Sequence, residues 1–471
     1  MIVAKAPDAQ LFYFAEELYR TPRSNFYARL NAVVGVWREL CAPLASAFSP
    51  ERNGRPTDHV VYFKIFLVGY MENITSDTAL AERVADSIAI REFIGFGPGE
   101  KTPDHSRLGP VRERFTRCGG LEKVMDAVVM KCVEAGLVSG EEVAADSTLI
   151  PANASLASLV SIKTGVTISE HFEQLRQENK KPTVSNDEFR STSDPDARIA
   201  KKGTNCPRGM YHKVTHVTDS ASQVILSAKV ATADIGDPEA VAVPLGEAKQ
   251  RLKDNQLTLG LVVCDAGYDD SSFHAFVEGM EATPLTNYTE SQSPKPEGYA
   301  KKDFVYDAEQ DLYICPNGKI LKRQCSEGDR VLYQALQTDC AGCPFKDLCL
   351  SKDKKQRSIR RAKNEAARER NIARCHTDEA RAALSRRKII VEPPIADLKC
   401  HGGLAKMNCR GTKNAQVKIT IAAIGWNLKK LVKKAGKGLL STIFGSIWTR
   451  ISEILQLKVP VYGNTLATTS R

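Results

Sequence analysis

The chain lacks both a secretory signal and a long uninterrupted apolar run. Residues 1–10 have neither a basic start nor a long apolar stretch. The most apolar segment, Val60–Met71, is short and contains Lys64, whereas a membrane-spanning helix needs about 20 apolar residues. No internal repeat is present either, which argues against a solenoid. We therefore expect a cytoplasmic protein that does not enter the membrane.

Acidic residues are outnumbered by basic ones. The 471 residues contain 56 Asp and Glu against 66 Lys and Arg, so the formal net charge is +10. An excess of this size suits a polyanionic partner, of which nucleic acid is the commonest, although a soluble protein can also simply be basic. The length allows two to four domains. In a reducing compartment, the thirteen cysteines are expected to be thiols or metal ligands and not disulfides.

Residues 1–120 have the pattern of several short helices. An amphipathic stretch covers 25–48, and the later helices are predicted from capping residues followed by apolar periodicity. These are Asp58 before 59–73, Ser76 and Asp77 before 78–85, Pro103–Ser106 before 108–115, and a helix over 88–94 that ends at Gly95. Such a module either presents a helix to a DNA groove or has a purely structural role.

The middle of the chain alternates between helix and strand patterns. Predicted helices alternate with predicted strands, of which the run 259–264 ends at Asp265. A polar stretch over 168–209 is predicted to be a long loop or an insertion. The predicted elements are a helix over 121–137, a strand over 142–150, a hairpin of 211–218 and 223–230, a helix over 239–252, a buried strand over 259–264, short strands within 286–350, and helices over 388–400 and 414–434. This order indicates a mixed α/β sheet behind a helical N-terminal region.

Three acids stand out by their placement. Asp146 lies in a short strand, Asp265 ends a buried strand, and Glu392 lies in a late helix. Active sites of open α/β sheets lie at strand ends, and converging carboxylates need a cation between them. Oxygen ligands suit Mg²⁺ or Mn²⁺, and two such ions catalyse phosphodiester chemistry. Each acid taken alone is more often a cap, a turn residue or an ion-pair partner.

Two further clusters are candidates for binding. The cysteines have the spacing Cys-x24-Cys-x2-Cys-x5-Cys, which suits either a structural Zn²⁺ or reduced thiols in a small subdomain; they are Cys315, Cys340, Cys343 and Cys349. The segment Lys352–Arg374 carries ten basic and three acidic residues. It either contacts a DNA backbone or forms a solvated helix face.

Several motifs, in this order, resemble the DDE transposases of bacterial insertion sequences. Each is weak alone, and the combined order over residues 54–431 is specific. The motifs are Gly54-Arg55-Pro56, Lys64–Tyr70, Pro103–Ser106, Ala145–Thr148 with Ala152–Ser155, Thr192–Arg198, Gly209–Lys213, Cys264–Tyr268, Arg387-Lys388 with Val391-Glu392 and Lys399, Arg410-Gly411, and Asn427-Leu428.

The resemblance implies an RNase H-like catalytic core in which Asp146, Asp265 and Glu392 bind Mg²⁺ or Mn²⁺. The enzyme would cut double-stranded DNA at terminal inverted repeats and transfer the freed 3′-hydroxyl to target DNA, as at least a dimer. Relatives carry a Tyr–Arg–Glu–Lys signature around the third acid. Here Glu392 and Lys399 fit, Arg387 or Lys388 fits loosely, the tyrosine is absent and Pro394-Ile395-Ala396 departs from the usual turn. Asp397 is a rival third acid on the same helix.

The resemblance also divides the chain and suggests DNA contacts. The predicted units are a helical DNA-end-binding domain at 1–120, RNase H-like parts at 121–285 and 376–435, a cysteine-rich insertion at 286–375 and a tail at 436–471. Residues expected to bind DNA are Lys213, Arg387, Lys388, Lys399 and Arg410. The alternatives are a domesticated or inactive relative that binds DNA without catalysis, and a nuclease of the same fold.

Overall fold

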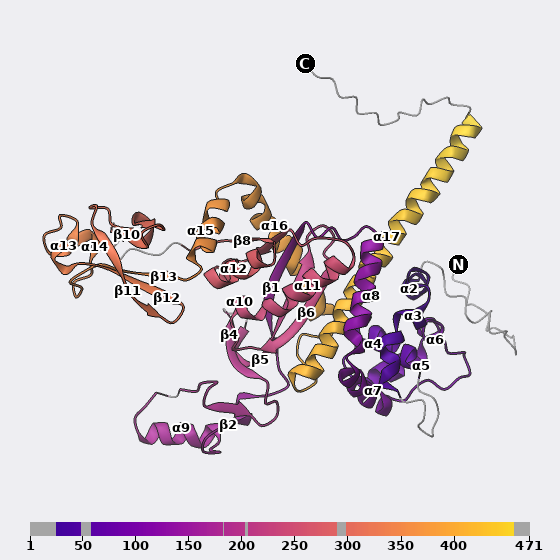
Figure 1. Ribbon diagram of the computed structural model, residues 1–471. Coiled ribbons are helices and arrows are strands. Elements are labelled where there is room, and N and C mark those ends of the chain that lie inside the picture. The colour runs from indigo at the N-terminus through magenta and orange to yellow at the C-terminus, as the bar shows by residue number, and fades with distance from the viewer. Residues whose placement is uncertain (1–24, 49–57, 182, 203–205, 290–297, 456–471) are drawn as a thin grey trace, which may run out of the picture.

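The computed structural model describes residues 25–48, 58–181, 183–202, 206–289 and 298–455. Figure 1 shows a helical N-terminal region beside a central sheet, a smaller sheet that projects from it, and a long C-terminal helix. The motif Gly54-Arg55-Pro56 and the predicted tail beyond Leu455 lie outside the described residues. Within the described ranges, no helix combines the length and apolar character that a membrane crossing requires.

The N-terminal region consists of short helices that begin at the predicted capping residues. Asp58, Ser76 and Asp104 each accept a hydrogen bond from a backbone N–H of the helix that follows, and Gly95 ends a helix with φ of 88°. The prediction of capped short helices is therefore confirmed. The helices are α2 (Phe26–Val34), α3 (Trp37–Leu40), η1 (Ala42–Ala47), α4 (His59–Met71), α5 (Asp77–Asp86), α6 (Ile88–Ile94) and α7 (His105–Cys118).

Helix α4 is the buried centre of this region, although it contains Lys64. The ammonium group donates a hydrogen bond of 2.7 Å to the carbonyl of Phe93 and lies 4.7 Å from the centre of the Trp37 ring. Burial lowers the pKa of Lys64 to about 8. The cation that interrupts the apolar run is thus held inside the helical region by a carbonyl and aromatic rings.

A six-stranded mixed sheet forms the centre of the chain. The strand order is β6-β5-β1-β7-β8, and β4 also pairs with β5. Strand β5 is antiparallel to β1, β4 and β6, whereas β1, β7 and β8 are parallel. The predicted strand around residue 146, the hairpin and the strand before residue 265 are confirmed. The strands are β1 (Glu142–Pro151), β4 (Arg198–Lys202), β5 (Cys206–Asp219), β6 (Ile225–Thr232), β7 (Leu261–Cys264) and β8 (Thr283–Thr286).

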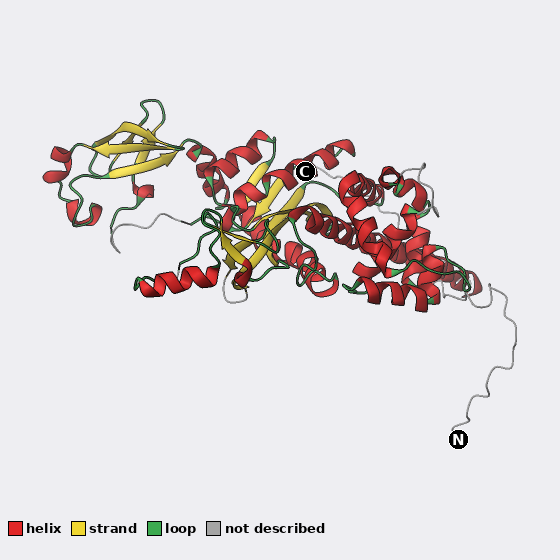
Figure 2. Ribbon diagram, turned by 90° about the horizontal axis from the view of Figure 1, so that it is seen from below, coloured by secondary structure: helices red, strands yellow, loops and turns green. Residues whose placement is uncertain are grey.

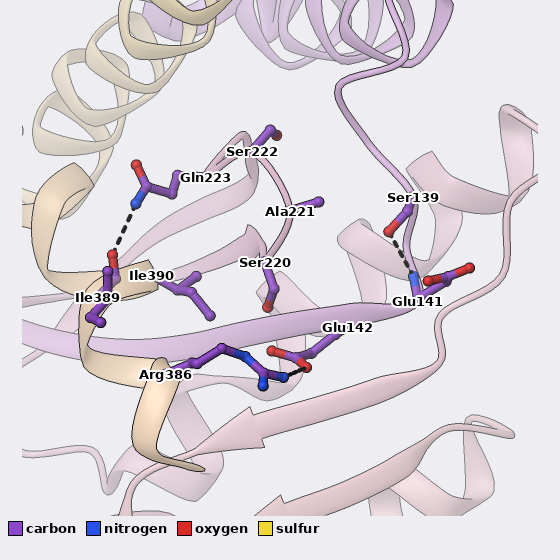
Figure 3. Close-up of a pocket in the computed structure, with 10 residues that line it drawn as sticks. All are labelled: Ser139, Glu141, Glu142, Ser220, Ala221, Ser222, Gln223, Arg386, Ile389 and Ile390. Carbon is purple, nitrogen blue, oxygen red and sulfur yellow. Dashed lines mark hydrogen bonds and ion pairs between the residues drawn. The ribbon is translucent and has the colours of Figure 1, made fainter. Parts of the chain in front are cut away.

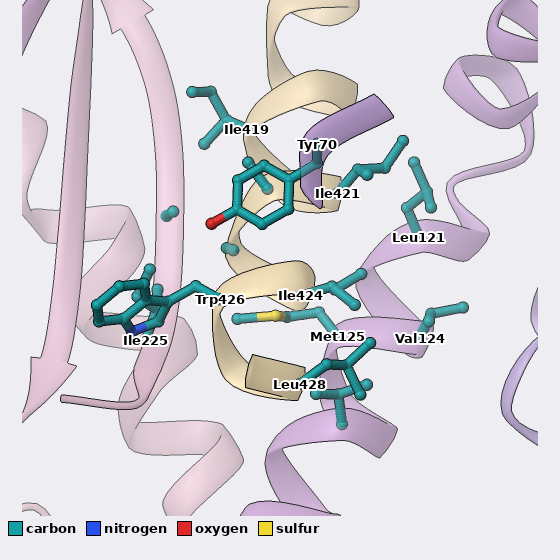
Figure 4. Packing of buried hydrophobic residues seen from close by; sticks show 14 of the residues in the cluster. Tyr70, Leu121, Val124, Met125, Ile225, Ile419, Ile421, Ile424, Trp426 and Leu428 are labelled. Atoms are coloured by element: carbon teal, nitrogen blue, oxygen red, sulfur yellow. The ribbon is translucent and has the colours of Figure 1, made fainter. Parts of the chain in front are cut away.

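Helices lie around the central sheet (Figure 2), and α8, α11, α12 and α17 share one hydrophobic core with the N-terminal region. Figure 4 shows Tyr70 of α4, Met125 of α8, Ile225 of β6 and Trp426 of α17 in this core. The N-terminal helices are therefore packed onto the sheet by way of α8 and α17. The surrounding helices are α8 (Gly120–Glu134), α10 (Asp237–Ala240), α11 (Ala242–Asp254), α12 (Ser271–Gly279), α15 (Glu365–Arg374), α16 (Asp378–Ala396) and α17 (Thr412–Leu455).

Carboxamide side chains form hydrogen bonds with backbone groups of β6 and β8, the first and last strands in the order β6-β5-β1-β7-β8. On β6, Asn427 accepts from the N–H of Ile225 and donates to its carbonyl, both at 2.8 Å. Gln416, three turns earlier in α17, accepts from the N–H of Val230 and donates to the carbonyl of Ala228, both at 2.8 Å. On β8, Asn371 of α15 accepts from the N–H of Thr286 and donates to its carbonyl, both at 3.1 Å. Each amide takes the place of a neighbouring strand.

Of the two alternatives for 168–209, a long loop or an insertion, the loop is wrong, because the segment has secondary structure of its own. This segment contains α9 (Ile168–Gln177), which starts with a capping box between Thr167 and Glu170. It also contains β3 (Phe189–Ser191), which pairs with β2 (Leu159–Ser161), and the strand β4. A small separate core holds this arm together. The helix was missed because Ile168 is its only buried residue.

The segment between β8 and α15 forms a second, smaller sheet, which bears out the prediction of short strands there. Its five antiparallel strands have the order β13-β12-β11-β10-β9 and their own core of tyrosines and aliphatic residues. The elements are η4 (Lys301–Asp303), β9 (Val305–Asp307), β10 (Leu312–Ile314), β11 (Ile320–Glu327), β12 (Arg330–Ala335), α13 (Gln337–Ala341), α14 (Lys346–Cys349) and β13 (Ser358–Ala362).

Helix α16 starts earlier than predicted, because Thr377 caps it. It contains Pro393 and Pro394, which lack the N–H groups that would bond to Ile389 and Ile390. The freed carbonyl of Ile389 instead accepts a hydrogen bond of 2.9 Å from the side chain of Gln223 (Figure 3). A π-helical turn, Asp397–His401, follows α16. Such turns interrupt the regular hydrogen-bond ladder and often occur near functional sites.

Candidate active site

Asp146 and Asp265 belong to adjacent parallel strands. The register of β1 and β7 pairs Ala144 with Val263, so two residues further along, Asp146 comes opposite Asp265. Cys264, fully buried before Asp265, has its pKa raised by burial and further by both carboxylates. The two acids therefore lie close together at the carboxyl end of β7, where α/β sheets hold their active sites.

Asp146 is half-buried and is contacted by cations. Burial raises the pKa of its carboxyl group, and Arg387 of α16, whose guanidinium lies 3.5 Å from the carboxylate, opposes this shift. Lys202 also lowers the pKa of Asp146 while its ammonium donates to the carbonyl of Ser147. The positive neighbours thus reduce, but do not cancel, the rise in the pKa of Asp146 that burial causes.

A buried hydroxyl network joins the backbone beside the two acids. The Ser147 hydroxyl lies 2.7 Å from the hydroxyl of Tyr268 and 2.7 Å from that of Thr215. Tyr268 ends the short turn η3 (Ala266–Tyr268), which Asp265 caps by accepting from the N–H of Gly267 at 2.9 Å. Tyr268 thereby fixes the turn after Asp265 to the residue after Asp146. Its place in the Asp-Ala-Gly-Tyr motif was the available sequence signal.

Asp237, at the start of α10, is an acid of this region that sequence reasoning missed. It raises the pKa of Asp146, after burial itself. A Cβ added to Gly267 would lie 3.0 Å from the Asp265 carboxylate and 3.5 Å from that of Asp237, so only glycine leaves this space open. Asp237 also forms an ion pair of 2.6 Å with Lys213. No strand-end pattern marks Asp237, since it follows a turn.

Glu392, expected to be the third acid, lies on the exposed side of α16. The face of this helix that packs on β1 consists instead of Arg387, Ile390 and Val391. Across the described ranges, no three His, Cys, Asp or Glu side chains are arranged to hold a metal ion. The structure therefore brings Asp146 and Asp265 together without Glu392. Asp397, the rival, is occupied by Tyr70 and Lys429.

The five residues expected to bind DNA have different environments. Lys213 is buried in its ion pair with Asp237, and Arg387 contacts Asp146. Lys399 donates to the hydroxyl of Thr148 at 2.6 Å and to a β1 carbonyl, and burial lowers its pKa. Lys388 and Arg410 are exposed.

The basic segment 352–374 divides into two kinds of residue. Its arginines are largely used inside the fold, because Arg361 pairs with Glu369 at 2.5 Å, Arg368 with Asp269 at 2.7 Å and Arg370 with Glu278 at 2.5 Å. Its lysines are exposed. The segment thus anchors the small sheet and α15 to the central sheet through Asp269, which follows the Asp265 motif.

The four predicted zinc ligands gather around one small cavity. Cys315, Cys340, Cys343 and Cys349 line a space of about 30 Å³ in the small sheet. The N–H of Lys319 donates to the Cys315 sulfur at 3.3 Å. Burial raises the pKa of Cys349, and the other three cysteines raise it further. The four thiols thus lie close together, but their sulfur atoms are not arranged as the ligands of one metal ion.

A larger pocket, of about 530 Å³, lies at the start of β1 (Figure 3). Arg386 spans it to Glu142 with an ion pair of 3.0 Å. Asp146 lies four residues further along β1, roughly 13 Å away at the rise of a strand. The pocket is therefore distinct from the two acids. It is lined by Ser139, Glu141, Glu142, Ser220, Ala221, Ser222, Gln223, Arg386, Ile389 and Ile390.

Comparison with known proteins gives two family matches. Residues 16–114 match the family described as Transposase domain (DUF772), and residues 314–432 match the Transposase DDE domain (DDE_Tnp_1_6). The chain is a transposase with these two domains. The second match identifies a transposase DDE domain, the domain that carries catalysis in DDE transposases. Glu392 lies inside the matched DDE range, whereas Asp146 and Asp265 precede it.

Two transposase complexes are among the solved structures that are similar to this chain. A piggyBac transposase synaptic complex with hairpin DNA is 13% identical, with 94% of this chain and 88% of that chain covered and a TM-score of 0.30. A Mos1 transposase paired-end complex with the left transposon end is 10% identical, with 51% and 62% covered and a TM-score of 0.17. No curated protein matches the chain.

Proposed function

We propose that this DDE transposase cuts double-stranded DNA at the ends of an insertion sequence and transfers the freed 3′-hydroxyl groups to target DNA. The observation that carries the proposal is the parallel register of β1 and β7, which, continued two residues beyond the pair Ala144 and Val263, brings Asp146 beside Asp265. The strand order β6-β5-β1-β7-β8, with its first three strands antiparallel and the rest parallel, supports an RNase H-like core. Joining two DNA ends calls for at least a dimer.

The donor set suits a divalent metal ion such as Mg²⁺ or Mn²⁺. Carboxylate oxygens are the ligands these ions prefer, and the open space at Gly267 lies beside one of the two carboxylates. Asp146 and Asp265 would hold the metal. Glu392, which is exposed on α16, would have to turn towards them to serve as the third ligand. When bound, two such ions activate the attacking oxygen and stabilise the leaving oxygen. Arg387 and Lys202 oppose the rise in the pKa of Asp146 that burial causes, and a bound cation would favour its carboxylate form further.

The exposed cations beside α16 suit the DNA backbone. Lys388 and Arg410 are free of ion pairs with the described residues and would contact phosphates. Lys213, Arg387 and Lys399 have protein partners, so their proposed DNA contacts require these partners to be exchanged for phosphate. Their first role is to hold Asp237, Asp146 and Thr148 in place.

A cleavage and strand-transfer assay tests the proposal. The substrate is DNA that carries the inverted repeats flanking the gene, with Mg²⁺ or Mn²⁺, and Asp265→Ala is the inactive comparison. We expect metal-dependent cutting at the repeat end that is lost in the variant, and joining of the cut ends to a target plasmid. Cutting without joining would indicate a nuclease.

A non-catalytic, DNA-binding relative is the second candidate, and the exposure of Glu392 together with the ion pair between Arg387 and Asp146 favours it. In that case the wild type and Asp265→Ala bind the repeat equally and neither cuts it. Absence of both binding and cutting would contradict the two candidates together.

We also propose that the four gathered cysteines hold a structural Zn²⁺. Thiolates at tetrahedral reach are its usual ligands, and an N–H donor to the Cys315 sulfur is already in place. Elemental analysis of purified protein should find about one zinc per chain, lost in Cys340→Ser but kept in Cys325→Ser, whose cysteine is exposed on β11. Equal zinc content in both variants would rule out this site.

A further inference from the structure

Asp397 has a role other than that of an acid in catalysis. Its carboxylate accepts a short hydrogen bond from the hydroxyl of Tyr70 and contacts the ammonium of Lys429 at 3.0 and 3.2 Å. Lys429 also lies 4.6 Å from the centre of the Tyr70 ring. Tyr70 belongs to α4, Asp397 to the π-helical turn and Lys429 to α17, so this cluster joins three elements that are distant in sequence.

The cluster is closely packed as well as hydrogen-bonded. Tyr70 is 5% exposed and lies against α17 (Figure 4). A Cβ added to Gly402 or Gly425 would overlap the Tyr70 ring, so both neighbours admit only glycine at these points. Burial and the hydrogen bond to Asp397 raise the pKa of Tyr70, which keeps the phenol protonated as a donor.

The chain needs an anchor at this position because the helix is interrupted just before it. Pro393 and Pro394 directly follow Glu392 and remove two helical hydrogen bonds. The turn beyond them is therefore held by side chains, with Asp397 bound to Tyr70 and Lys429 on one side and Lys399 bound to Thr148 on β1 on the other. Asn408 adds a further bond of 2.7 Å to the carbonyl of Thr75.

We propose that Tyr70 is a positioning residue for the DDE site: through Asp397 it sets where the segment from Glu392 to Lys399 lies over β1. The inference rests on the proposed function for its catalytic consequence, but the positioning itself does not. The N-terminal transposase domain thus contributes to the geometry of the DDE domain, apart from any contact of its own with DNA.

Hydrogen exchange measured on the full chain tests the positioning. In Tyr70→Phe the ring stays and only the donor to Asp397 is lost, so we expect amides of residues 395–404 to exchange roughly tenfold faster while those of α8 and β1 do not change. Tyr62→Phe is the matched control, because Tyr62 is buried on the same helix and its hydroxyl makes no hydrogen bond with the described residues. Unchanged exchange at 395–404 in Tyr70→Phe would overturn the proposal.

Asp397→Asn provides the second variant, since an amide can accept from Tyr70 but loses the ion pair with Lys429. It should accelerate exchange in the same segment. Under single-turnover conditions Tyr70→Phe should lower the cleavage rate about tenfold with unchanged affinity for repeat DNA. A normal rate in Tyr70→Phe, with active wild type, would reduce Tyr70 to a structural residue. If wild type does not cut, the proposed function fails, while the exchange comparison still decides the positioning.

Discussion

Several charged side chains of this protein are buried in apolar surroundings, and Lys64 is the clearest case. Its pKa of about 8 lies below the ordinary value of 10.5, because burial disfavours the ammonium form. Between these two values the unfolded chain binds more protons than the folded one, so stability must rise with pH. The stability cost of Lys64 is fully present below about pH 8 and disappears towards pH 10.5.

We expect wild type to gain about 2 kcal/mol of unfolding free energy relative to Lys64→Met between pH 7.5 and 9.5. Urea unfolding of both proteins at the two pH values measures this difference, and the comparison cancels the titration of every other group. The same change in both proteins would show that Lys64 keeps an ordinary pKa in the fold.

The carboxamide contacts of α17 are features of an element, because they depend on the whole helix lying along β6. Asn427→Leu should cost about 3 kcal/mol, since it leaves the N–H and carbonyl of Ile225 buried without partners. Lys434→Leu, on the exposed side of the same helix, should change stability by less than about 0.5 kcal/mol. If both substitutions lowered the free energy of unfolding equally in urea, the amide of Asn427 would not act in place of a neighbouring strand.

Sequence patterns located the elements whose signals are local. Asp58, Ser76 and Asp104 could be identified as caps because a cap and its helix are neighbours in the chain. The run before Asp265 was identifiable because a strand buried on both faces is apolar throughout. Helix α9 was not, since it exposes nearly all of its residues.

The candidate site was predictable only in part, for the same reason. Asp146 and Asp265 follow strand patterns, and two strands of one parallel sheet end at the same edge. The exposure of Glu392 depends on which face of α16 packs on β1, and the contacts of Lys213 and Lys399 depend on Asp237 and Thr148, which are distant in sequence. No local pattern contains such pairings.

At the scale of the whole molecule, the chain has two main cores. One joins the N-terminal helices, the central sheet and α17, and the other lies inside the small sheet. We expect amides of α4, β1 and α17 to lose hydrogen-exchange protection together as urea is added, and those of β10 to β13 to lose it at a different concentration. Native-state exchange by mass spectrometry measures both, and loss of all protection at one concentration would contradict the division.

The amide side chains on β6 and β8 have a consequence for assembly. Exposed strand edges are where one sheet recruits strands from another chain. Here the amides of Asn427 and Gln416 already bond to backbone groups of β6, and that of Asn371 bonds to Thr286 on β8. A second copy could lengthen the central sheet at β6 or β8 only by displacing these amides, so strand addition at these two edges is disfavoured.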